Sequence, residues 1–354
     1  MLVHVFDDTP HHYLPMYRFF TRLKDVSFEQ VFLVRSPKAG NPLSADELGL
    51  RYYQDAGDLL AQLYALPKQS KIVFHGLFDL KNICSKLLFS SLARRCSCVF
   101  WGAEIYRHTT KNKNLKQRLV QAMHLLALRR FEKVLCLNPG DAALVKKHLY
   151  CDKAVVLPYP LLSKQFSFNE SNNTEMPSPL KFLVGNSAAA SNEHLYALEQ
   201  LKHLAGEDIE IYLPLNYGGE PEYVEQVIGR GRELFGDKVK PLVKMLKQDE
   251  YDALLAKTHI AVFAHQRQQG LYVAYAMLQT GKRLFLRRDT SSFDNLSALG
   301  FEVNQTEQLA KISIDSHRQS ASRLNAENAR LFESNFTEQA LLPKWREFFI
   351  SIVR

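Results

Sequence analysis

Lys181-Phe-Leu-Val-Gly-Asn-Ser-Ala-Ala-Ala-Ser-Asn-Glu-His194 is the stretch that decides the fold. Its first residues are apolar enough to form a buried strand, and Gly185-Asn-Ser187 ends that strand. Ser191 is a residue type that caps helices, so we predict that a helix begins at Asn192. Free backbone N–H groups and the helix dipole at such a turn both favour negative charge. The stretch therefore predicts the first βα turn of a domain that binds a phosphorylated ligand.

Strand and helix patterns alternate on both sides of this stretch, which is typical of α/β domains with parallel sheets. Apolar runs predict strands at 1–6, 29–34, 71–75, 97–101, 133–137, 153–157, 180–184, 209–214, 238–242, 259–263 and 283–287. Helical patterns lie at 12–24, 57–66, 79–93, 111–131, 140–149, 192–204, 221–235, 248–257, 270–280, 291–299, 316–333 and 336–352. The fold class we predict is α/β, with doubly wound, Rossmann-like units.

A stretch rich in proline and polar residues, 161–179, divides the alternating pattern and is predicted to be a linker. We therefore expect an N-terminal domain over 1–160 and a C-terminal domain over 180–334. A last amphipathic helix within 335–354 can cross back to the N-terminal domain. Ligands of doubly wound domains bind at the carboxyl ends of strands, so we expect the chemistry in a cleft that both domains face.

The net charge of +8 is concentrated in the first half of the chain. Residues 1–163 hold 23 Lys and Arg against 13 Asp and Glu, a balance of +10, and the remainder is at −2. The segment 107–133 carries eight of these cations, with leucines at helical spacing. Such a helix can lie on anionic lipid, or it can pack on a core with a solvated cationic face. No nucleic-acid-binding module accompanies the charge, so we expect no nucleic-acid partner.

Several classes of protein are excluded by what the sequence lacks. No apolar run reaches the roughly 18–20 residues that span a bilayer, and no signal peptide is recognisable, so we expect the chain to stay in the cytoplasm. The five cysteines are an odd number without metal spacing, which predicts buried thiols, and we expect no metal and no cofactor. No P-loop and no Asp-x-Asp motif occurs.

Polar residues gather where predicted strands end, which favours function over core packing. Four groups of residues carry a resemblance to a known family: Asp8-x-Pro-His-His12; Phe74-His-Gly76 with Trp101-Gly-Ala-Glu-x-Tyr106; Val184-Gly-Asn-Ser187 with Ser191-Asn-Glu-His194; and Arg267-Gln-Gln-Gly270. Their order and spacing resemble the 4-acetamido-4,6-dideoxy-galactose (N-acetylfucosaminyl) transferases of enterobacterial common antigen synthesis, glycosyltransferase family 56. The family usually has Asp at the position of Glu104.

The resemblance implies a GT-B type glycosyltransferase. The sugar would move from a dTDP donor to an undecaprenyl-diphosphate-linked saccharide at the cytoplasmic face of the inner membrane. The enzyme would be peripheral, held by the anionic membrane surface, with the N-terminal domain binding the acceptor. Acceptor-binding residues would be His11, His12, Gly76, Trp101, Tyr106 and Arg107.

The chemistry of glycosyl transfer assigns roles to the remaining polar residues. A leaving diphosphate needs positive charge or N–H groups, and an inverting transfer needs a base for the acceptor hydroxyl. The predicted donor-binding residues are Gly185, Asn186, Ser187, Asn192, His194, Tyr212, Tyr217, Lys244, Arg267, Gln268, Gln269 and Gly270. Candidates for the catalytic base are Glu104 first, then Asp8, and then His75. A retaining transfer stays open, and would need no such base.

Two other functions remain open at this stage. One is a GT-B enzyme of another kind, a nucleotide-sugar 2-epimerase, which turns over the donor alone. The other is a non-catalytic nucleotide-sugar binding protein with two α/β lobes. Release of dTDP with and without a lipid-linked acceptor separates both from a transferase.

Overall fold

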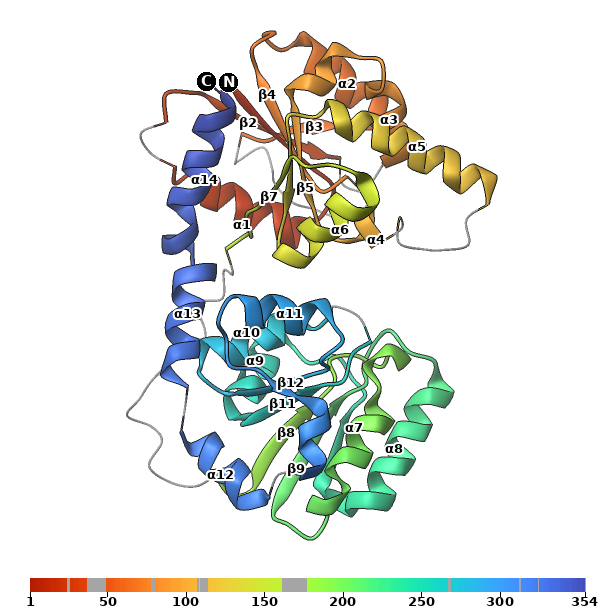
Figure 1. The fold of residues 1–354 in the computed structure, drawn as a ribbon, viewed down its shortest axis with the longest axis vertical. Helices are drawn as coiled ribbons and strands as arrows, with labels where there is room; N and C mark the ends of the chain where they lie inside the picture. Colours follow the sequence, from red (N-terminus) through yellow and green to blue (C-terminus); the bar gives the residue numbers. More distant parts are fainter. Residues whose placement is uncertain are drawn as a thin grey trace. The chain divides into compact units, whose positions relative to one another are not determined.

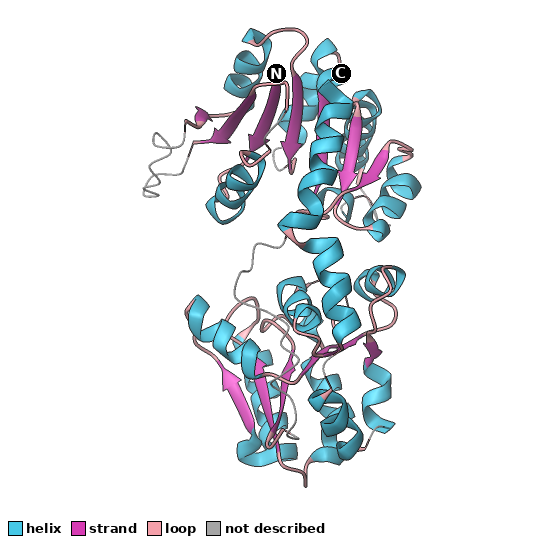
Figure 2. Cartoon of the chain, turned by 90° about the vertical axis from the view of Figure 1, so that its left-hand side faces the viewer, coloured by secondary structure: helices cyan, strands magenta, loops and turns pink. Residues whose placement is uncertain are grey.

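The computed structural model describes residues 1–23, 26–36, 49–77, 80–106, 108, 114–160, 177–266, 269–311, 313–323 and 325–353. Two compact units make up the chain (Figure 1). The first unit is formed by Met1–Leu162 with Phe336–Arg354, and the second by Ser163–Asn335. In each unit, parallel strands form a sheet that helices cover (Figure 2).

The first unit contains a 7-stranded sheet in the order β3-β2-β1-β4-β5-β6-β7. Its strands are β1 (Leu2–Phe6), β2 (Gln30–Arg35), β3 (Arg51–Tyr53), β4 (Lys71–His75), β5 (Cys96–Phe100), β6 (Lys133–Cys136) and β7 (Ala154–Val156). Its helices are α1 (Pro10–Phe20), α2 (Ala56–Ala65), α3 (Leu80–Leu87), α4 (Ala103–Tyr106), α5 (Leu115–Arg130), α6 (Pro139–Leu149) and α14 (Glu338–Val353). β1 is central, with Leu2 beside Gln30 on one side and Lys71 on the other.

Side chains alternate between the two faces of this sheet along each strand, and both faces are covered by helices and buried. On one face, Val3 and Val5 belong to a cluster that also contains Phe74 and Phe131. On the other face, Leu2 and Phe6 pack with Trp345 and Phe349 of α14. The last helix of the chain is therefore part of the first unit.

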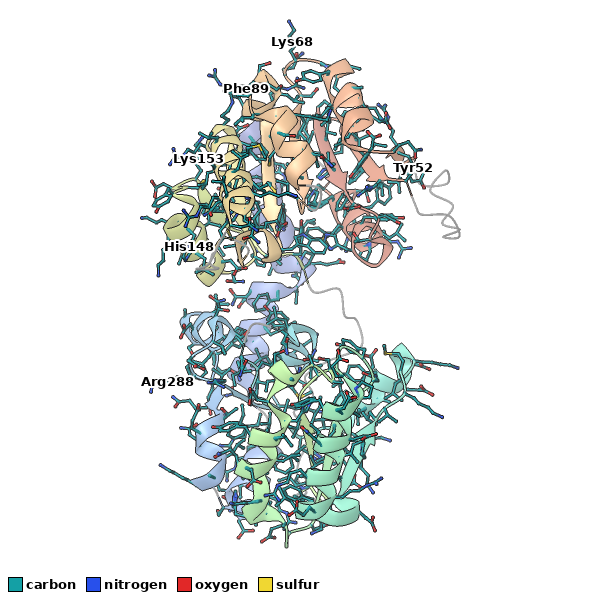
Figure 3. All side chains as sticks on the ribbon, turned by 90° about the vertical axis from the view of Figure 1, so that its right-hand side faces the viewer. Tyr52, Lys68, Phe89, His148, Lys153 and Arg288 are labelled. Atoms are coloured by element: carbon teal, nitrogen blue, oxygen red, sulfur yellow. The ribbon has the colours of Figure 1, made fainter. Side chains whose placement is uncertain are left out.

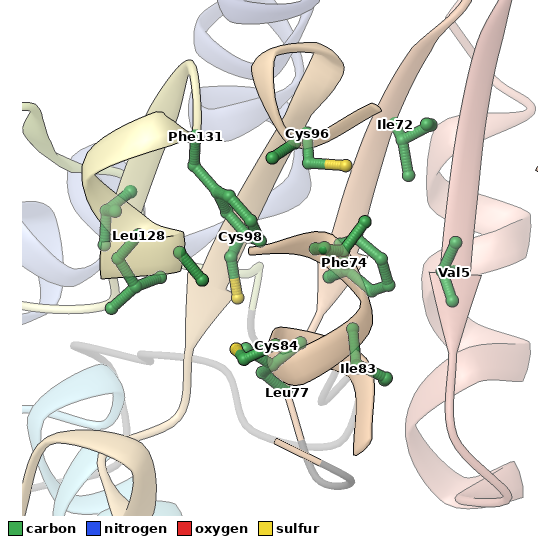
Figure 4. Packing of buried hydrophobic residues seen from close by; sticks show 14 of the residues in the cluster. Val5, Ile72, Phe74, Leu77, Ile83, Cys84, Cys96, Cys98, Leu128 and Phe131 are labelled. Carbon is green, nitrogen blue, oxygen red and sulfur yellow. The ribbon is translucent and has the colours of Figure 1, made fainter. Parts of the chain in front are cut away.

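Side chains fill the space between sheet and helices in both units (Figure 3). Figure 4 shows the cluster around Phe74, with the sulfur atoms of Cys84, Cys96 and Cys98 inside it. All five cysteines are buried thiols, as the sequence predicts. Burial raises the pKa of Cys136 to about 12, so its thiol stays protonated and serves as an apolar packing group.

The second unit contains a 6-stranded sheet in the order β10-β9-β8-β11-β12-β13. Its strands are β8 (Leu180–Val184), β9 (Ile209–Pro214), β10 (Val239–Leu242), β11 (Ile260–Phe263), β12 (Arg283–Leu286) and β13 (Asn304–Gln305). Its helices are α7 (His194–Leu201), α8 (Pro221–Phe235), α9 (Gln248–Lys257), α10 (Leu271–Gln279), α11 (Ser291–Ala298), α12 (Ile314–Ser322) and α13 (Ala326–Phe336).

The two sheets share one topology, in which the strand order reverses once. The reversal falls between β1 and β4 in the first unit, and between β8 and β11 in the second. Ligands of doubly wound sheets bind outside the carboxyl ends of strands at this point. The topology therefore directs attention to the loops that follow β8 and β11, and to those that follow β1 and β4.

Two local predictions are wrong. Ser191 does not cap a helix, because it lies in a short 3₁₀ turn, Ala190–Asn192; α7 begins at His194 after Glu193, whose φ is 54°. The predicted helix over 316–333 is two helices, α12 and α13. Asn325 lies at the break: its side-chain oxygen accepts from the Asn328 N–H at 2.9 Å, at the start of α13, and its own N–H donates to the distant Gly281 carbonyl at 2.7 Å instead of continuing α12.

Candidate functional site

The loops after β8 and β11 meet at the carboxyl edge of the second sheet. The Gly185 N–H donates to the Val262 carbonyl at 3.0 Å, and the Gln266 N–H donates to the Ser191 carbonyl at 3.0 Å. Gln269 and Ser191 also face each other, with the Gln269 amide nitrogen 3.3 Å from the Ser191 hydroxyl. The 181–194 stretch and the segment before α10 thus form one structure, which we call the second-unit rim.

Two glycines allow this close approach. Gly185 has φ +74°, and a Cβ built there would lie 2.4 Å from His194 Nε2. Gly270 has φ +69°, and its Cβ would lie 3.0 Å from His265 Cε1 and 3.1 Å from Asn186 Cγ. Any side chain at either position would have to displace a polar residue and adopt a backbone conformation that favours glycine. The glycines therefore bring Asn186, His194 and His265 around the switch point of the sheet.

His194 presents a proton at this rim. Its backbone N–H donates to the Tyr223 hydroxyl oxygen at 3.3 Å, and the same hydroxyl lies 3.2 Å from His194 Nδ1. Among the described residues, the Tyr223 hydroxyl has no acceptor other than Nδ1, so its proton points to Nδ1, which leaves the ring proton on Nε2. His194 Nε2 is buried and has no hydrogen-bond partner. His194 therefore holds an unused N–H donor beside Gly185.

His265 presents the opposite group. Its Nδ1–H donates to the Gln269 carbonyl at 3.1 Å, so Nε2 carries a lone pair. This Nε2 is also buried without a partner, and the side chain is 4% exposed. The ring stacks on Phe263 at 4.6 Å between centroids, which fixes its orientation. His265 is thus a rigid hydrogen-bond acceptor at the end of β11.

Asn192 organises the loop between these two histidines. Its side-chain oxygen accepts from the Asn186 N–H at 2.9 Å, and its amide nitrogen donates to the Ser187 hydroxyl at 3.1 Å. Asn186 in turn donates to the Tyr217 hydroxyl at 3.4 Å, and its Oδ1 is buried without a partner. Asn186 Oδ1 is therefore a second unused acceptor of the rim.

Burial keeps both rim histidines neutral at physiological pH. It lowers the pKa of His265 to about 4, although the bond to the Gln269 carbonyl acts in the opposite direction. Burial also lowers the pKa of His194 to about 4, with a further contribution from the nearby His265. The described part of the rim therefore offers oriented dipoles, one donor and two acceptors, and no titrating charge near pH 7.

The other predicted donor-binding residues lie at different places. Tyr217, half-exposed, is beside Asn186 at this rim. The Tyr212 hydroxyl donates to Glu210 at 2.8 Å, back along β9 and away from the carboxyl edge. Lys244 is exposed in the loop after β10, the far edge of the sheet. Arg267 and Gln268 lie outside the described residues.

Glu104 sits at the carboxyl edge of the first sheet and is 2% exposed. One carboxylate oxygen accepts from the Leu77 N–H at 3.0 Å and the other from the Trp101 N–H at 3.1 Å. Since Leu77 follows β4 and Trp101 follows β5, the carboxylate holds the ends of these two strands together. Glu104 therefore serves the architecture of the first-unit rim, by which we mean the loops after β1, β4 and β5.

His75 lies in a buried chain of hydrogen bonds. Tyr159 O–H donates to His75 Nδ1 at 2.6 Å, and His75 Nε2–H donates to His4 Nδ1 at 3.0 Å. His4 Nε2–H then donates to Gln30 Oε1 at 3.0 Å, and the Gln30 amide donates to the Phe20 carbonyl at 3.1 Å. Burial lowers the pKa of His4 to about 3 and holds that of His75 well below its usual value. Both nitrogens of His75 are occupied inside the core.

The remaining first-unit residues lie around this chain. The His12 ring packs edge-on against Trp101 at 4.1 Å and against Tyr159 at 4.8 Å. Gly76 has φ 90° and donates to the Val99 carbonyl at 2.9 Å. Asp8 is partly exposed after β1, and its N–H donates to Asp7 at 2.8 Å. Arg107 and the side chains of His11 and Tyr106 lie outside the described part.

Sequence reasoning missed two residues of the second-unit rim, His265 and Tyr223. The signal for His265 was present, because it follows the apolar run of β11 by two residues, as Asn186 follows that of β8. Tyr223 lies on α8, 29 residues from His194, and no spacing rule links them. Among the described residues, no three His, Cys, Asp or Glu side chains gather as metal ligands do.

Known proteins with similar structures span the whole chain. A glycosyltransferase from Rickettsia africae has a TM-score of 0.68 at 13% identity, over 100% of this chain and 98% of its own. Sucrose-phosphate synthase from Thermosynechococcus elongatus has a TM-score of 0.71 at 10% identity, over 99% of each chain. Anabaena HepE, solved with UDP and glucose, has a TM-score of 0.68 at 11% identity, over 99% and 100%. The fold is thus of the GT-B type.

A family model assigns the activity class. The model described as 4-alpha-L-fucosyltransferase, glycosyl transferase group 56, matches residues 1–349. The match includes both rims and most of the final helix. The chain therefore belongs to the glycosyl transferase group 56 family, as its motifs predict, and is a glycosyltransferase.

Proposed function

We propose that the protein transfers a 4-acetamido-4,6-dideoxy-galactose-type sugar from dTDP to a polyprenyl-diphosphate-linked saccharide. The observation that carries the donor half of this proposal is the second-unit rim. There, His194, His265 and Asn186 keep buried polar atoms without partners at the switch point of the sheet. A buried polar atom without a partner costs about 1–3 kcal/mol, so the fold maintains these groups against its own stability.

The chemistry of the rim fits a nucleotide diphosphate-sugar. The Nε2–H donor of His194 suits a diphosphate oxygen, and the N-terminus of α10 at Gly270 adds a favourable dipole. The acceptors on His265 and Asn186 suit the O–H and N–H groups of an acetamido sugar. Anabaena HepE, which shares the fold, holds UDP and glucose. We propose Arg267 as the cation that stabilises the departing diphosphate.

The first unit would bind the acceptor through the residues of its rim. For an inverting transfer, a carboxylate must take the proton of the acceptor hydroxyl. Asp8 suits this role better than Glu104, because Asp8 is partly exposed while both oxygens of Glu104 hold backbone N–H groups. We therefore propose Asp8 as the base and assign Glu104 to positioning the ends of β4 and β5.

We also propose that the first unit docks on the anionic cytoplasmic face of the inner membrane. On α5, Leu115, Leu119 and Leu126 are 85%, 63% and 49% exposed and form one stripe, because they recur at helical spacing. Lys116, Arg118 and Arg129 lie on the same helix. None of the described helices combines the length and the apolar composition needed to traverse a bilayer. The stripe with its cations fits a surface association.

Phe89 extends the apolar surface beyond α5. It is 88% exposed, and Figure 3 shows it and Lys68 projecting from the first unit. Arg130, the last residue of α5, donates to the Ser90 carbonyl at 3.1 Å and so ties the helix to the turn that carries Phe89. An aromatic side chain beside a basic helix is the composition that binds the lipid headgroup region.

The transfer is tested by measuring dTDP release from the dTDP-sugar with and without a polyprenyl-diphosphate-linked disaccharide. We expect stoichiometric release and sugar transfer only when the acceptor is present. The same assay on Asp8→Asn and Glu104→Gln separates the two carboxylates. Asp8→Asn should lose about a hundredfold or more in rate, while Glu104→Gln should lose mainly stability. A wild-type rate in Asp8→Asn would remove Asp8 as the base.

Membrane docking is tested by flotation with phosphatidylglycerol-containing vesicles. Replacing the three stripe leucines by serine should abolish flotation, because about 0.8 kcal/mol of membrane affinity is lost for each buried CH₂. The matched control replaces Val243 and Met245, exposed apolar residues of the second unit, by serine and should float as wild type does. Equal losses in both variants would contradict the assignment to α5.

A further inference from the structure

A polar cavity lies in the second unit, away from the second-unit rim. It has a volume of about 230 Å³, and its lining includes Lys282, Arg283, Glu302 and Arg323. Arg283 is the first residue of β12, so the cavity opens at the amino edge of the sheet, whereas the rim lies at the carboxyl edge. A strand of 4 residues separates the two edges by roughly 13 Å. The cavity is therefore distinct from the proposed donor site.

Arg283 is held in a fixed orientation in the lining of this cavity. One guanidinium nitrogen, Nη2, donates to Asn304 Oδ1 at 3.3 Å, and Cζ lies 5.1 Å from the centre of the Phe285 ring. The other, Nη1, is buried and has no hydrogen-bond partner. The stacked ring and the Asn304 bond fix the plane of the guanidinium. A guanidinium held in one plane is the geometry that binds phosphate oxygens.

The part of the lining that contains Glu302 is held in place by two asparagines. The Asn325 amide donates to Glu302 Oε2 at 2.7 Å, and the Asn328 amide donates to the Glu302 carbonyl at 2.9 Å. The Glu302 N–H donates to Asn328 Oδ1 at 2.8 Å. These bonds position the Glu302 carboxylate in a lining that also contains three cations. Since a carboxylate repels an anion but accepts from hydroxyls, the wall suits the uncharged part of a ligand.

The charge of the cavity is positive overall. Arg283 and Arg323 are cations, and Lys282 adds a third, although its ammonium donates to the Leu255 carbonyl at 3.0 Å at the end of α9. Among the described lining residues, Glu302 is the one carboxylate. A cavity of this volume is larger than one phosphate group needs, so there is room for a hydroxylated group beside Glu302.

From these contacts we propose that the cavity binds a soluble phosphate monoester that carries hydroxyl groups, such as a sugar phosphate. The phosphate pairs with Arg283 and Arg323, and a hydroxyl donates to Glu302. This binding is non-covalent and is independent of the donor site. It holds whether or not the proposed sugar and acceptor are correct.

Isothermal titration calorimetry with glucose 6-phosphate, inorganic phosphate and glucose tests the proposal on the full chain. We expect saturable binding of glucose 6-phosphate, weaker binding of phosphate, and no binding of glucose. Arg283→Gln should weaken the binding of glucose 6-phosphate by about tenfold or more, because a charge-assisted pair is lost. Arg323→Gln, a change of an exposed residue, should weaken it as well and covers the case in which Arg283→Gln does not fold.

Two control variants and one vesicle assay separate the proposal from its alternatives. Arg330→Gln removes an exposed arginine paired with Glu327 on α13, and should bind as wild type does. Gly270→Ala disturbs only the second-unit rim and should also retain binding. Loss of binding in Gly270→Ala, or equal loss in Arg330→Gln, would overturn the proposal. So would flotation with phosphatidic acid vesicles that depends on Arg283, because the phosphate would then be a lipid headgroup.

Discussion

The two sheets share a topology, but the polar residues at their carboxyl edges differ in whether they are hydrogen-bonded within the fold. In the second unit, His194 Nε2, His265 Nε2 and Asn186 Oδ1 are buried without partners. In the first unit, Glu104 holds two backbone N–H groups and His75 is bonded at both nitrogens. Polar residues at strand ends are therefore of two kinds: those bonded within the fold and those left for a ligand.

The difference has an energetic meaning. Satisfied buried groups stabilise the fold, whereas an unsatisfied one costs about 1–3 kcal/mol. The second-unit rim is therefore less stable than a fully bonded loop would be, and a ligand that supplies the missing partners gains affinity from the same groups. Substitutions at the second-unit rim should reduce activity, and substitutions at the first-unit network should reduce stability.

The largest effect is expected for Gly185→Ala. Its Cβ would lie 2.4 Å from His194 Nε2, and φ of +74° is unfavourable for alanine by about 1–2 kcal/mol. His194 must move, so we expect sugar transfer to fall by about a hundredfold or more. Gly229→Ala is the matched control, because nothing lies within 4 Å of its Cβ on α8. It should keep full activity, and its free energy of unfolding, measured by thermal denaturation, should rise by about 0.5–1 kcal/mol. A Gly185→Ala enzyme with wild-type activity would contradict the proposal that the second-unit rim binds the donor.

His265→Phe changes one side chain of the second-unit rim and so tests whether that rim binds the donor. The change removes the unpaired Nε2 acceptor and the Nδ1–H bond to the Gln269 carbonyl, and it keeps a ring on Phe263. We expect kcat/KM for the donor to fall by about 10- to 100-fold, with a loss of about 1 kcal/mol in stability. His317→Phe is the control within the same unit. His317 is also buried with both nitrogens unpartnered, but its ring packs between Phe182 and Phe285 on the sheet face. We expect His317→Phe to leave kcat/KM unchanged. Equal losses in both variants would show a general packing effect.

The sequence predicts the scaffold of this site well and its contacts poorly. β8, β9 and α8 lie within one residue of their predicted bounds, because apolar runs and proline or glycine boundaries are local signals. β3 and β13 were missed, since strands of three and two residues carry too little pattern. The roles of Glu104 and His75 depend on Leu77, His4 and Tyr159, which are distant in sequence or reach them through backbone atoms. Strand-end position alone could not distinguish a bonded residue from an unbonded one.

The first-unit network is tested by His75→Phe. The substitution removes the bonds to Tyr159 and His4 and leaves their buried polar groups unsatisfied, so the free energy of unfolding should fall by about 2–4 kcal/mol. For the fraction that remains folded, kcat/KM should stay within about threefold of wild type. Chemical unfolding followed by circular dichroism measures the first quantity, and initial rates at matched folded concentration measure the second. A stable but inactive variant would assign His75 to the reaction.

The last expected effect concerns the pH dependence of stability, and its slope is close to zero at pH 7. The folded pKa of His265 is lowered to about 4, whereas in the unfolded chain this histidine titrates at its ordinary pKa of 6.5. Between these values the unfolded chain binds a proton that the folded chain does not, so this contribution is complete above pH 6.5 and is lost as pH falls toward 4. His265→Phe should therefore flatten the wild-type slope by at most one proton, about 1.4 kcal/mol per pH unit.

The same pKa values bear on the reaction. Because burial keeps His194 and His265 neutral down to about pH 4, donor kcat/KM should show no inflection near pH 6.5 that depends on either residue. An inflection near 6.5 that disappears in His265→Phe would mean that its ring is hydrated in the working enzyme. The unpaired Nε2 would then be an ordinary solvated nitrogen, and the contrast between the two rims would fail at its central residue. A flat profile, with the loss of kcat/KM in His265→Phe retained at every pH, leaves hydrogen bonding by a neutral ring as the source of the effect.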